Sequence, residues 1–300
     1  MAAQTDRSRL RRLYRAALAG ADPETAVRRA LAEPAVRAVL ARARRVGVFA
    51  SGKAAAAMLA GVQGVSGPRL AVVPRDGVRP RGGAEILAAA HPEPDRSSVH
   101  AARRAVAFFS EFGDGDAILC LVSGGTSSLL CLPRPGLSLA QKRRRIALLA
   151  RRGAPINEVN RLRTSLSAVK GGRLGRATRA RLVTLVLSDV PGDRAALVGS
   201  GPTVRRRRGD VVRVVASNSS GIAAAAREAR SMGLAPCVAG RLSGEAREAG
   251  ARFGRAALRL RPGEALLAGG ETTVLLAGRS GRGGRGGRSL EFALGAACIL

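Results

Sequence analysis

Residues 117–130 read Ala-Ile-Leu-Cys-Leu-Val, then Ser-Gly-Gly-Thr-Ser-Ser, then Leu-Leu. The opening apolar run is typical of a parallel strand that is buried on both faces. Residues 123–128 supply glycines that let a ligand approach the backbone and hydroxyls that can donate to it. A small-residue loop between a strand and a helix directs N–H groups at an anion. The stretch therefore predicts a phosphate-binding loop, although many strand-to-helix turns bind nothing.

The bulk composition limits the class of protein. A chain of 300 residues with 46% apolar content can form one large or two ordinary domains around a sizeable core. It has no uninterrupted apolar run long enough to span a bilayer and no apolar leader, so we expect no membrane segment and a cytoplasmic location. The cysteines are far apart and lack a Cys-x-x-Cys pair, which argues against a zinc site or a disulfide framework. They are Cys120, Cys131, Cys237 and Cys298.

The formal net charge of +30 first suggests nucleic-acid binding. The arginines are scattered along the chain, however, and one Tyr and six Phe leave few rings on which bases could stack. A GC-rich genome also tends to encode an Ala-, Arg- and Gly-rich chain with few lysines. We therefore expect nucleic acid to bind only non-specifically.

Apolar runs alternate with helix-compatible segments along the whole chain. Strands are predicted at 46–50, 70–73, 85–90, 117–122, 182–187, 211–216 and 265–268, with 274–277 extending the last. Helices are predicted at 6–19, 23–32, 96–112, 139–152, 221–232 and 289–300, and another strand–loop–helix unit at 236–259. Asp22, Asp95 and Ser138 are expected to cap the helices that follow them. The alternation predicts an α/β fold with a mostly parallel sheet and flanking helices.

Loops that follow parallel strands share one edge of the sheet, where open α/β sheets bind ligands. We therefore expect Lys53, the 123–128 loop, Lys170, Asp189 and Glu271 to line one crevice. Cations, backbone donors and carboxylates in one crevice are suited to Mg²⁺-dependent phosphoryl transfer. The chain has no G-x-x-x-x-G-K-[ST] motif and no protein-kinase motif set, which excludes the usual kinase folds.

Other charged segments have simpler interpretations. Residues 142–145 are predicted to form a solvated helix surface, and the arginine run 205–208 an exposed loop. The Gly- and Arg-rich segment 278–288 could pass for an RNA-binding tract, but it is short and lacks aromatic residues, so an anion-binding loop is preferred. His91 lies in a Pro-rich turn and could either contact a ligand or hold the turn together, the second role being the more usual.

The ordered set of motifs resembles that of the glycerate 2-kinases, a family that includes proteins long labelled hydroxypyruvate reductases of tartrate degradation. The resemblance covers nearly the whole chain. Its motifs are Ser51–Ala54, His91–Asp95, Leu121–Gly125, Ile156–Asn160 with Arg163 and Ser167, Lys170–Gly172, Ser188–Asp193, Ser200–Thr203 and Gly269–Val274.

The resemblance implies ATP- and Mg²⁺-dependent phosphorylation of D-glycerate at its 2-hydroxyl, on a Rossmann-like sheet. It implies catalytic roles for Lys53, Asp189 and Arg288, and Asp189 and Asp193 as candidate Mg²⁺ ligands. The residues that it assigns to substrate or phosphate binding are Ser123, Gly124, Gly125, Thr126, Ser127, Lys170 and Glu271.

The resemblance also predicts the domain organisation. Residues 1–243 would form the N-terminal α/β domain, and 262–300 the opening of a MOFRL-type C-terminal α/β domain. The family's later Thr-Asp-Gly and Asp-Gly-Pro motifs are missing, so we expect a truncated chain with impaired activity and a tendency to associate, including as a homo-oligomer. Two further departures are Thr164-Ser165, where the family usually has Lys-His, and the arginine run 205–208 in place of Pro-Asp.

Two other functions stay open at this point. An NAD(P)H-dependent hydroxypyruvate reductase would match the family's older label, but no G-x-G-x-x-G follows an early strand with a suitably placed acidic residue. A non-catalytic basic protein that binds nucleic acid would match the charge, and its binding would weaken steeply with salt.

Overall fold

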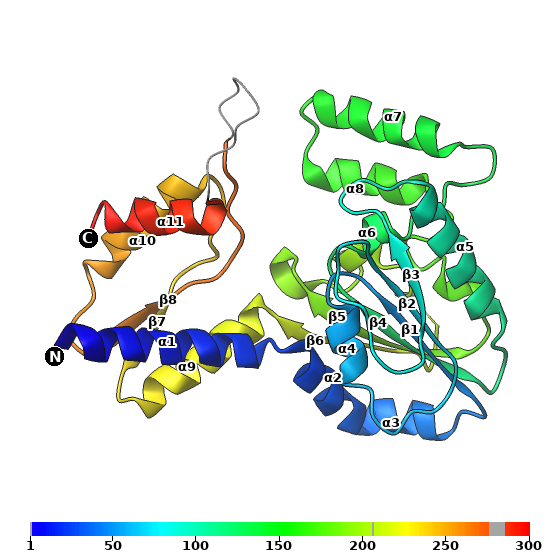
Figure 1. The fold of residues 1–300 in the computed structure, drawn as a ribbon, viewed down its shortest axis with the longest axis horizontal. Helices are drawn as coiled ribbons and strands as arrows, with labels where there is room; N and C mark the ends of the chain where they lie inside the picture. The colour runs from blue at the N-terminus through cyan, green and yellow to red at the C-terminus, as the bar shows by residue number, and fades with distance from the viewer. Residues whose placement is uncertain (1, 206, 276–285) are drawn as a thin grey trace. The chain divides into compact units, whose positions relative to one another are not determined.

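The computed structural model describes residues 2–205, 207–275 and 286–300 (Figure 1). The chain divides into two compact units, which we call the large unit (Asp22–Ser217) and the small unit (Met1–Ala21 with Asn218–Leu300). Among the described helices, none is both long and apolar enough to cross a bilayer. The domain ranges 1–243 and 262–300 stay a prediction.

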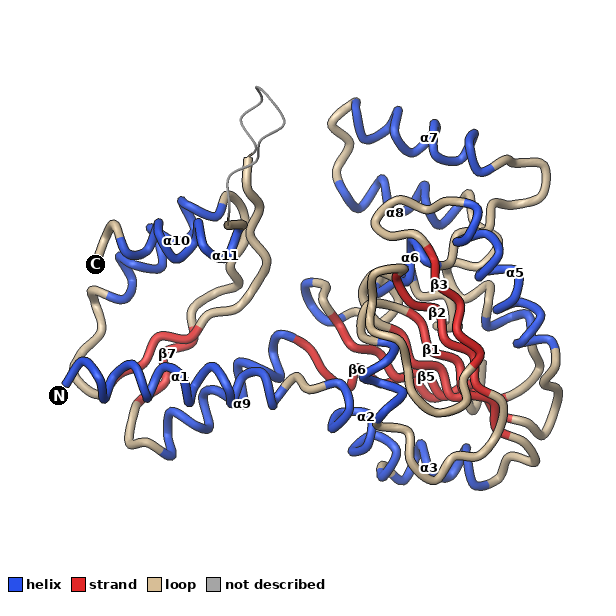
Figure 2. The backbone as a smooth tube through the Cα atoms, in the orientation of Figure 1, coloured by secondary structure: helices blue, strands red, loops and turns tan. Residues whose placement is uncertain are grey.

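The strands of the large unit, red in Figure 2, form one six-stranded sheet. Its order is β3-β2-β1-β4-β5-β6, and every pair is parallel. This confirms the predicted α/β class. The order reverses between β1 and β4, which is the switch point of a doubly wound sheet. The strands are β1 (Val46–Ser51), β2 (Arg69–Pro74), β3 (Glu85–Ala89), β4 (Ala117–Val122), β5 (Arg181–Ser188) and β6 (Val211–Ser217).

The core covers both faces of this sheet because side chains alternate along each strand. On β4, Ile118 and Cys120 face the apolar side of α5 (Arg96–Ser110), while Leu119 and Leu121 face the opposite cluster. All four side chains are fully buried, as the continuous apolar run predicted. The helices on the second face are α2 (Pro23–Ala32), α3 (Pro34–Ala41) and α4 (Ala55–Ala60).

The predicted caps form. Asp22 accepts a hydrogen bond from the Thr25 N–H at 2.9 Å, and Asp95 and Ser138 both form capping boxes. The sequence interpretation did not identify α3 or α8 (Ile156–Ser165) as helices. The remaining helices of the large unit are α6 (Thr126–Leu129) and α7 (Leu139–Arg151), with short 3₁₀ turns at Gly175–Ala177, Pro191–Asp193 and Val198–Ser200.

The small unit pairs α1 (Ala2–Gly20) with α9 (Asn218–Ser231), and α10 (Ala246–Ala257) with α11 (Arg288–Ala297). Helices α10 and α11 approach closely at Gly250, where there is no room for a side chain. A Cβ at this position would lie 2.1 Å from the Phe292 carbonyl oxygen. Two parallel strands, β7 (Ala235–Val238) and β8 (Glu264–Leu267), complete it. Residues 274 and 275 lie outside the strands, and 276–285 lie outside the described residues, so the anion-binding interpretation of 278–288 stays a prediction.

The arginine run does not form the exposed loop that the sequence suggested. The Arg205 side chain is only 6% exposed and pairs with the buried Asp210 carboxylate at 2.8 Å. Its guanidinium also donates to the carbonyls of Gly175, Thr178 and Ala180. A guanidinium presents five donors in a fixed fork, so this one side chain joins the 175–180 segment to Asp210, which precedes β6.

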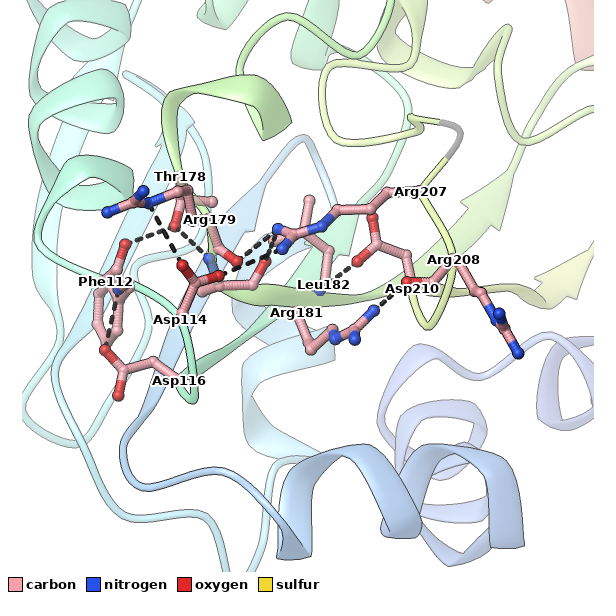
Figure 3. A network of polar contacts seen from close by, with 12 residues as sticks. Phe112, Asp114, Asp116, Thr178, Arg179, Arg181, Leu182, Arg207, Arg208 and Asp210 are labelled. Atoms are coloured by element: carbon pink, nitrogen blue, oxygen red, sulfur yellow. Dashed lines mark hydrogen bonds and ion pairs between the residues drawn. The ribbon is translucent and has the colours of Figure 1, made fainter.

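The rest of the run differs from residue to residue. Figure 3 shows Arg207 reaching Asp114, at 3.4 Å, and the carbonyl of Arg179. Arg208 is exposed, and its carbonyl accepts a hydrogen bond from Arg181. These contacts lie where β4, β5 and β6 begin, at the edge of the sheet opposite to the loops that carry the predicted site.

We expect Arg205→Ala to lower the free energy of unfolding by about 3–5 kcal/mol, because it leaves the Asp210 carboxylate buried without its partner. The matched control is Arg208→Ala, which removes an exposed guanidinium and should change the free energy by less than about 0.5 kcal/mol. Urea unfolding followed by circular dichroism measures both. Equal midpoints for the two variants would contradict a structural role for Arg205.

Candidate active site

The loops after β1 and β4 are joined at the switch point of the sheet. The Lys53 N–H donates to the Gly124 carbonyl at 2.8 Å, and the Ala54 N–H donates to Ser123 Oγ at 3.1 Å. Thr126 Oγ1 donates to the Ser51 carbonyl at 2.8 Å, from the first turn of α6. These bonds satisfy polar groups just beyond the last paired residues of both strands and hold the two loops in one arrangement.

Glycine is required where these loops meet. Gly52 has φ +124°, and a Cβ there would lie 2.1 Å from Ser123 Oγ. A Cβ at Gly124 would lie 2.0 Å from Oδ2 of Asp189, the residue that follows β5. The Asp189 carboxylate is therefore in contact with the Gly124 backbone, as the shared edge of the sheet predicted.

Gly125 provides the second meeting point. It has φ +90° and begins α6. A Cβ at Gly125 would lie 3.1 Å from Lys53 Cγ and 3.3 Å from His91 Cδ2, so both side chains lie beside this glycine. His91 follows β3 by one loop residue. Side chains from the ends of β1, β3 and β5 thus surround the 123–127 backbone.

Lys170 reaches the same loop from the segment between α8 and β5. Its Nζ donates to the carbonyl oxygen and the hydroxyl of Ser127. The Ser200–Thr203 turn supports this arrangement, because the Ser200 carbonyl accepts the Gly171 N–H at 2.9 Å and Ser200 Oγ lies 3.2 Å from Ser127 Oγ. The Lys-Gly-Gly and Ser-Gly-Pro-Thr motifs therefore act together to place Lys170.

A cavity of about 640 Å³ opens beside the loop. Its walls are α7, α8 and the turn that contains His91, and its base includes Gly125, Ser127 and Lys170. Lys142 lines it with an exposed fraction of only 2%. The other lining residues are Pro92, Glu93, Pro94, Ser128, Cys131, Arg143, Arg144, Ile146, Ala147, Ala150 and Arg163.

Burial and charge shift the pKa values of the groups that line the cavity. Burial lowers the pKa of Lys170 to about 7, and the positive charges of Lys142 and Arg163 add to the effect. Burial also lowers the pKa of Lys142, with a partial opposing effect from Cys131. The pKa of His91 lies below its ordinary value because of burial and the charge of Lys53. The shift favours the neutral imidazole.

The candidate Mg²⁺ ligands lie near each other in sequence but do not belong to a preformed metal site. Within the described residues, no group of three or more His, Cys, Asp or Glu side chains is placed to hold a metal ion. Asp189 is exposed beside Gly124, and Asp193 is half-buried in the following turn with φ +49°. One or two carboxylates suffice for Mg²⁺ when substrate phosphates supply further oxygens.

Two predicted residues belong to the small unit. Arg288 begins α11, and its Nη1 lies 2.6 Å from Oε1 of Glu271. The Glu271 N–H donates to the Leu242 carbonyl at 3.1 Å. They therefore form an ion pair with each other, and their roles in a site stay a prediction.

Sequence reasoning missed one feature of the site and underrated another. Lys142 was assigned to a solvated helix face, but its side chain is buried, so that assignment is wrong for this residue. Only the spacing of Lys142, Ile146 and Ala150 along one side of α7 could have indicated a shared inward face. His91 was expected more to hold its turn than to contact a ligand, yet it lines the cavity and lies beside Gly125.

The comparisons with known proteins agree with this architecture. The protein-family model described as "domain of unknown function (DUF4147)" matches residues 9–229 of this chain. A putative hydroxypyruvate reductase of Agrobacterium vitis is 39% identical over 97% of this chain and 76% of its own length. The glycerate 2-kinase of Pyrococcus horikoshii is 32% identical over 65% of this chain and 56% of its own.

Solved structures give the same result at the level of the fold. The glycerate kinase of Thermotoga maritima superposes with a TM-score of 0.84 and 28% identity, over 99% of this chain and 80% of that one. A Pyrococcus horikoshii protein superposes with a TM-score of 0.77 and 28% identity, over 98% of this chain and 80% of that one. The chain therefore belongs to the glycerate kinase family and contains its N-terminal DUF4147 domain.

Proposed function

We propose that this chain is a D-glycerate 2-kinase that transfers the γ-phosphoryl group of ATP to the 2-hydroxyl of D-glycerate. The observation that carries the proposal is the meeting of Lys53, Asp189 and Lys170 around the 123–127 loop at the switch point of the sheet. Family membership supports kinase chemistry, since relatives carry the names glycerate kinase and glycerate 2-kinase. The acceptor and the position of phosphorylation are our inference.

We assign a separate role in phosphoryl transfer to each residue of the site. The hydroxyl oxygen of the acceptor bonds to the γ-phosphorus as the bond to the β–γ bridging oxygen breaks, and ADP leaves. We assign charge stabilisation on the transferred group to Lys53 and the loop backbone. We assign the hydroxyl proton to His91, whose neutral imidazole faces the cavity. Lys170 binds an anionic group of the substrate.

The donor set beside Gly124 fits a magnesium–nucleotide complex. Asp189 supplies an exposed carboxylate there, and Asp193 offers a second in the next turn. Mg²⁺ prefers oxygen ligands, and when bound it would neutralise charge on the phosphates. We propose Asp189 as the principal ligand and Asp193 as an additional one.

We expect Lys53→Ala to lower kcat for ATP-dependent phosphorylation of D-glycerate by about 100-fold or more, because it removes the cation assigned to the transferred phosphoryl group. A coupled ADP-release assay measures this. The matched control is Arg145→Ala, an exposed cation on α7 that does not line the cavity. Equal turnover of Lys53→Ala and the wild type would contradict the assignment.

Gly124→Ala tests the contact between the loop and Asp189. The new Cβ would lie 2.0 Å from Asp189 Oδ2, so the carboxylate must move. We expect kcat to fall by about 100-fold, because small displacements of positioned groups cost rates of this order. Gly113→Ala is the control, since a Cβ there meets nothing within 4 Å. If both variants retained wild-type kcat, Asp189 would not act from its place beside Gly124.

The lowered pKa of Lys170 predicts a dependence of stability on pH. The unfolded chain has an ordinary lysine near 10.5, whereas the folded chain loses this proton near pH 7. Between these values the unfolded state binds more protons, so the free energy of unfolding of the ligand-free protein should rise with pH. Lys170→Met should remove that part of the rise, measured by urea unfolding at pH 7 and 9.

The protonation of Lys170 should also govern the binding of D-glycerate. Affinity for D-glycerate should fall as pH rises above about 7, because the ligand-free protein then carries a neutral Lys170. Lys170→Met should bind D-glycerate more weakly and with a shallower pH profile. Identical pH profiles for the wild type and Lys170→Met would contradict a role of Lys170 in binding the anion.

A reductase function has one observation in its favour, the name of the Agrobacterium vitis relative. The residues after β1 argue against it, since 51–56 read Ser-Gly-Lys-Ala-Ala-Ala and lack the glycines with which a dinucleotide fold approaches pyrophosphate. Oxidation of NADH or NADPH by hydroxypyruvate in the presence of the protein would favour the reductase and count against the kinase.

A further inference from the structure

The cavity beside α7 is lined by a buried amine, that of Lys142. Lys142 is 2% exposed, and its Nζ has no hydrogen-bond partner among the described residues. An ammonium removed from water without compensation is strongly unfavourable. The thiol of Cys131 interacts with this amine and partly opposes the effect of burial on its pKa, but a thiol is only a weak acceptor. A buried ammonium without a hydrogen-bond partner that lines a cavity is a candidate group for binding an anion.

The helix that carries Lys142 makes this burial unusual. Helix α7 packs against α8 (Figure 1), and Lys142 is its only buried residue in the described structure. Ile146, Ala147 and Ala150 also line the cavity. A surface helix normally buries an apolar stripe, whereas the buried side chain of α7 is that of a lysine.

The other lining groups leave the cavity positively charged. Lys170, Arg143, Arg144 and Arg163 line it together with Lys142. Glu93 is the one carboxylate among the lining residues, and it pairs with Arg143 at 2.6 Å near the surface. Cations that line one cavity repel each other, so an anion bound among them is stabilised.

We propose that this cavity binds the carboxylate of the acceptor, with Lys142 and Lys170 as its two ammonium partners. The proposal rests on the kinase function proposed above and adds the groups that select a 2-hydroxy monocarboxylate. Lys53 and Asp189, the residues assigned to phosphoryl transfer, do not line the cavity, whereas Gly125 and Ser127 do. An acid whose carboxylate lies in the cavity can therefore present its hydroxyl across the loop to the phosphoryl group.

This assignment favours a carboxylate over a phosphate of the nucleotide. The cavity walls combine amines with Pro92, Pro94, Ile146 and Ala147, which suit the short carbon chain of a hydroxy acid. The loop residue in contact with the candidate magnesium ligand is Gly124, which lies outside the cavity lining. The phosphates are thus expected on the Gly124 side and the carboxylate on the Ser127 side.

The test compares Lys142→Met with Arg145→Met on the same helix. Methionine keeps an unbranched chain at the buried position, while Arg145 is exposed and does not line the cavity. Binding of D-glycerate, inorganic phosphate and a non-hydrolysable ATP analogue is measured by calorimetry on each protein. Thermal unfolding without ligand is measured in parallel.

We expect Lys142→Met to weaken D-glycerate binding by about 10- to 100-fold, the range for a hydrogen bond to a charged group. Binding of the ATP analogue should be unchanged, and Tm without ligand should stay equal or rise because an unsatisfied buried charge has gone. Arg145→Met should match the wild type in every measurement.

Three results would overturn the proposal. If phosphate or the ATP analogue weakens while D-glycerate does not, the bound anion is a phosphate. If no affinity changes and Tm falls, Lys142 is structural. If the wild type binds the ATP analogue but not D-glycerate, the assignment of the cavity to the acceptor carboxylate is wrong. If the wild type does not bind the ATP analogue at all, the kinase proposal itself fails, which is a different result from these three.

Discussion

The parallel pairing of β1 with β4 is the interaction on which the site depends. Register Ser51↔Val122 brings both strands to the same edge, and the order of the sheet reverses between them. The loops that follow must then diverge to opposite faces, which leaves a crevice above the strand ends. The hydrogen bonds of Lys53 and Thr126 close the base of this crevice, so Asp189 and His91 need only short loops to reach it.

The sequence predicts this part of the molecule well because its causes are local or periodic. Continuous apolar runs identify the strands buried on both faces, and Asp95 and Ser138 cap helices through contacts a few residues away. Parallel connectivity then places Lys53, the 123–127 loop and Asp189 at one edge without further information. The ordered motifs add specificity, since unrelated doubly wound proteins share the edge but not the residues.

What the sequence could not supply are contacts between distant segments whose residues look ordinary in isolation. Arg205 lies in a run of like charges, and its burial follows from Asp210 and three carbonyls that fold back around it. Lys142 lies in the sequence Lys-Arg-Arg-Arg, and the three arginines that follow it are exposed. Only the packing of α7 against α8 turns the Lys142 position inward. Charge runs mark surfaces on average, but tertiary packing decides for each residue.

The choice of lysine at these positions has a physical consequence in so arginine-rich a chain. A guanidinium stays charged when buried and presents five donors. Arg205 directs its donors at the carbonyls of Gly175 and Thr178. An ammonium is compact, and its pKa falls on burial, so Lys170 near pH 7 can become neutral when no anion is present. An anion that enters restores the proton and the charge together. Buried arginine therefore suits a permanent clamp, whereas buried lysine suits a site that must be both empty and filled during each cycle.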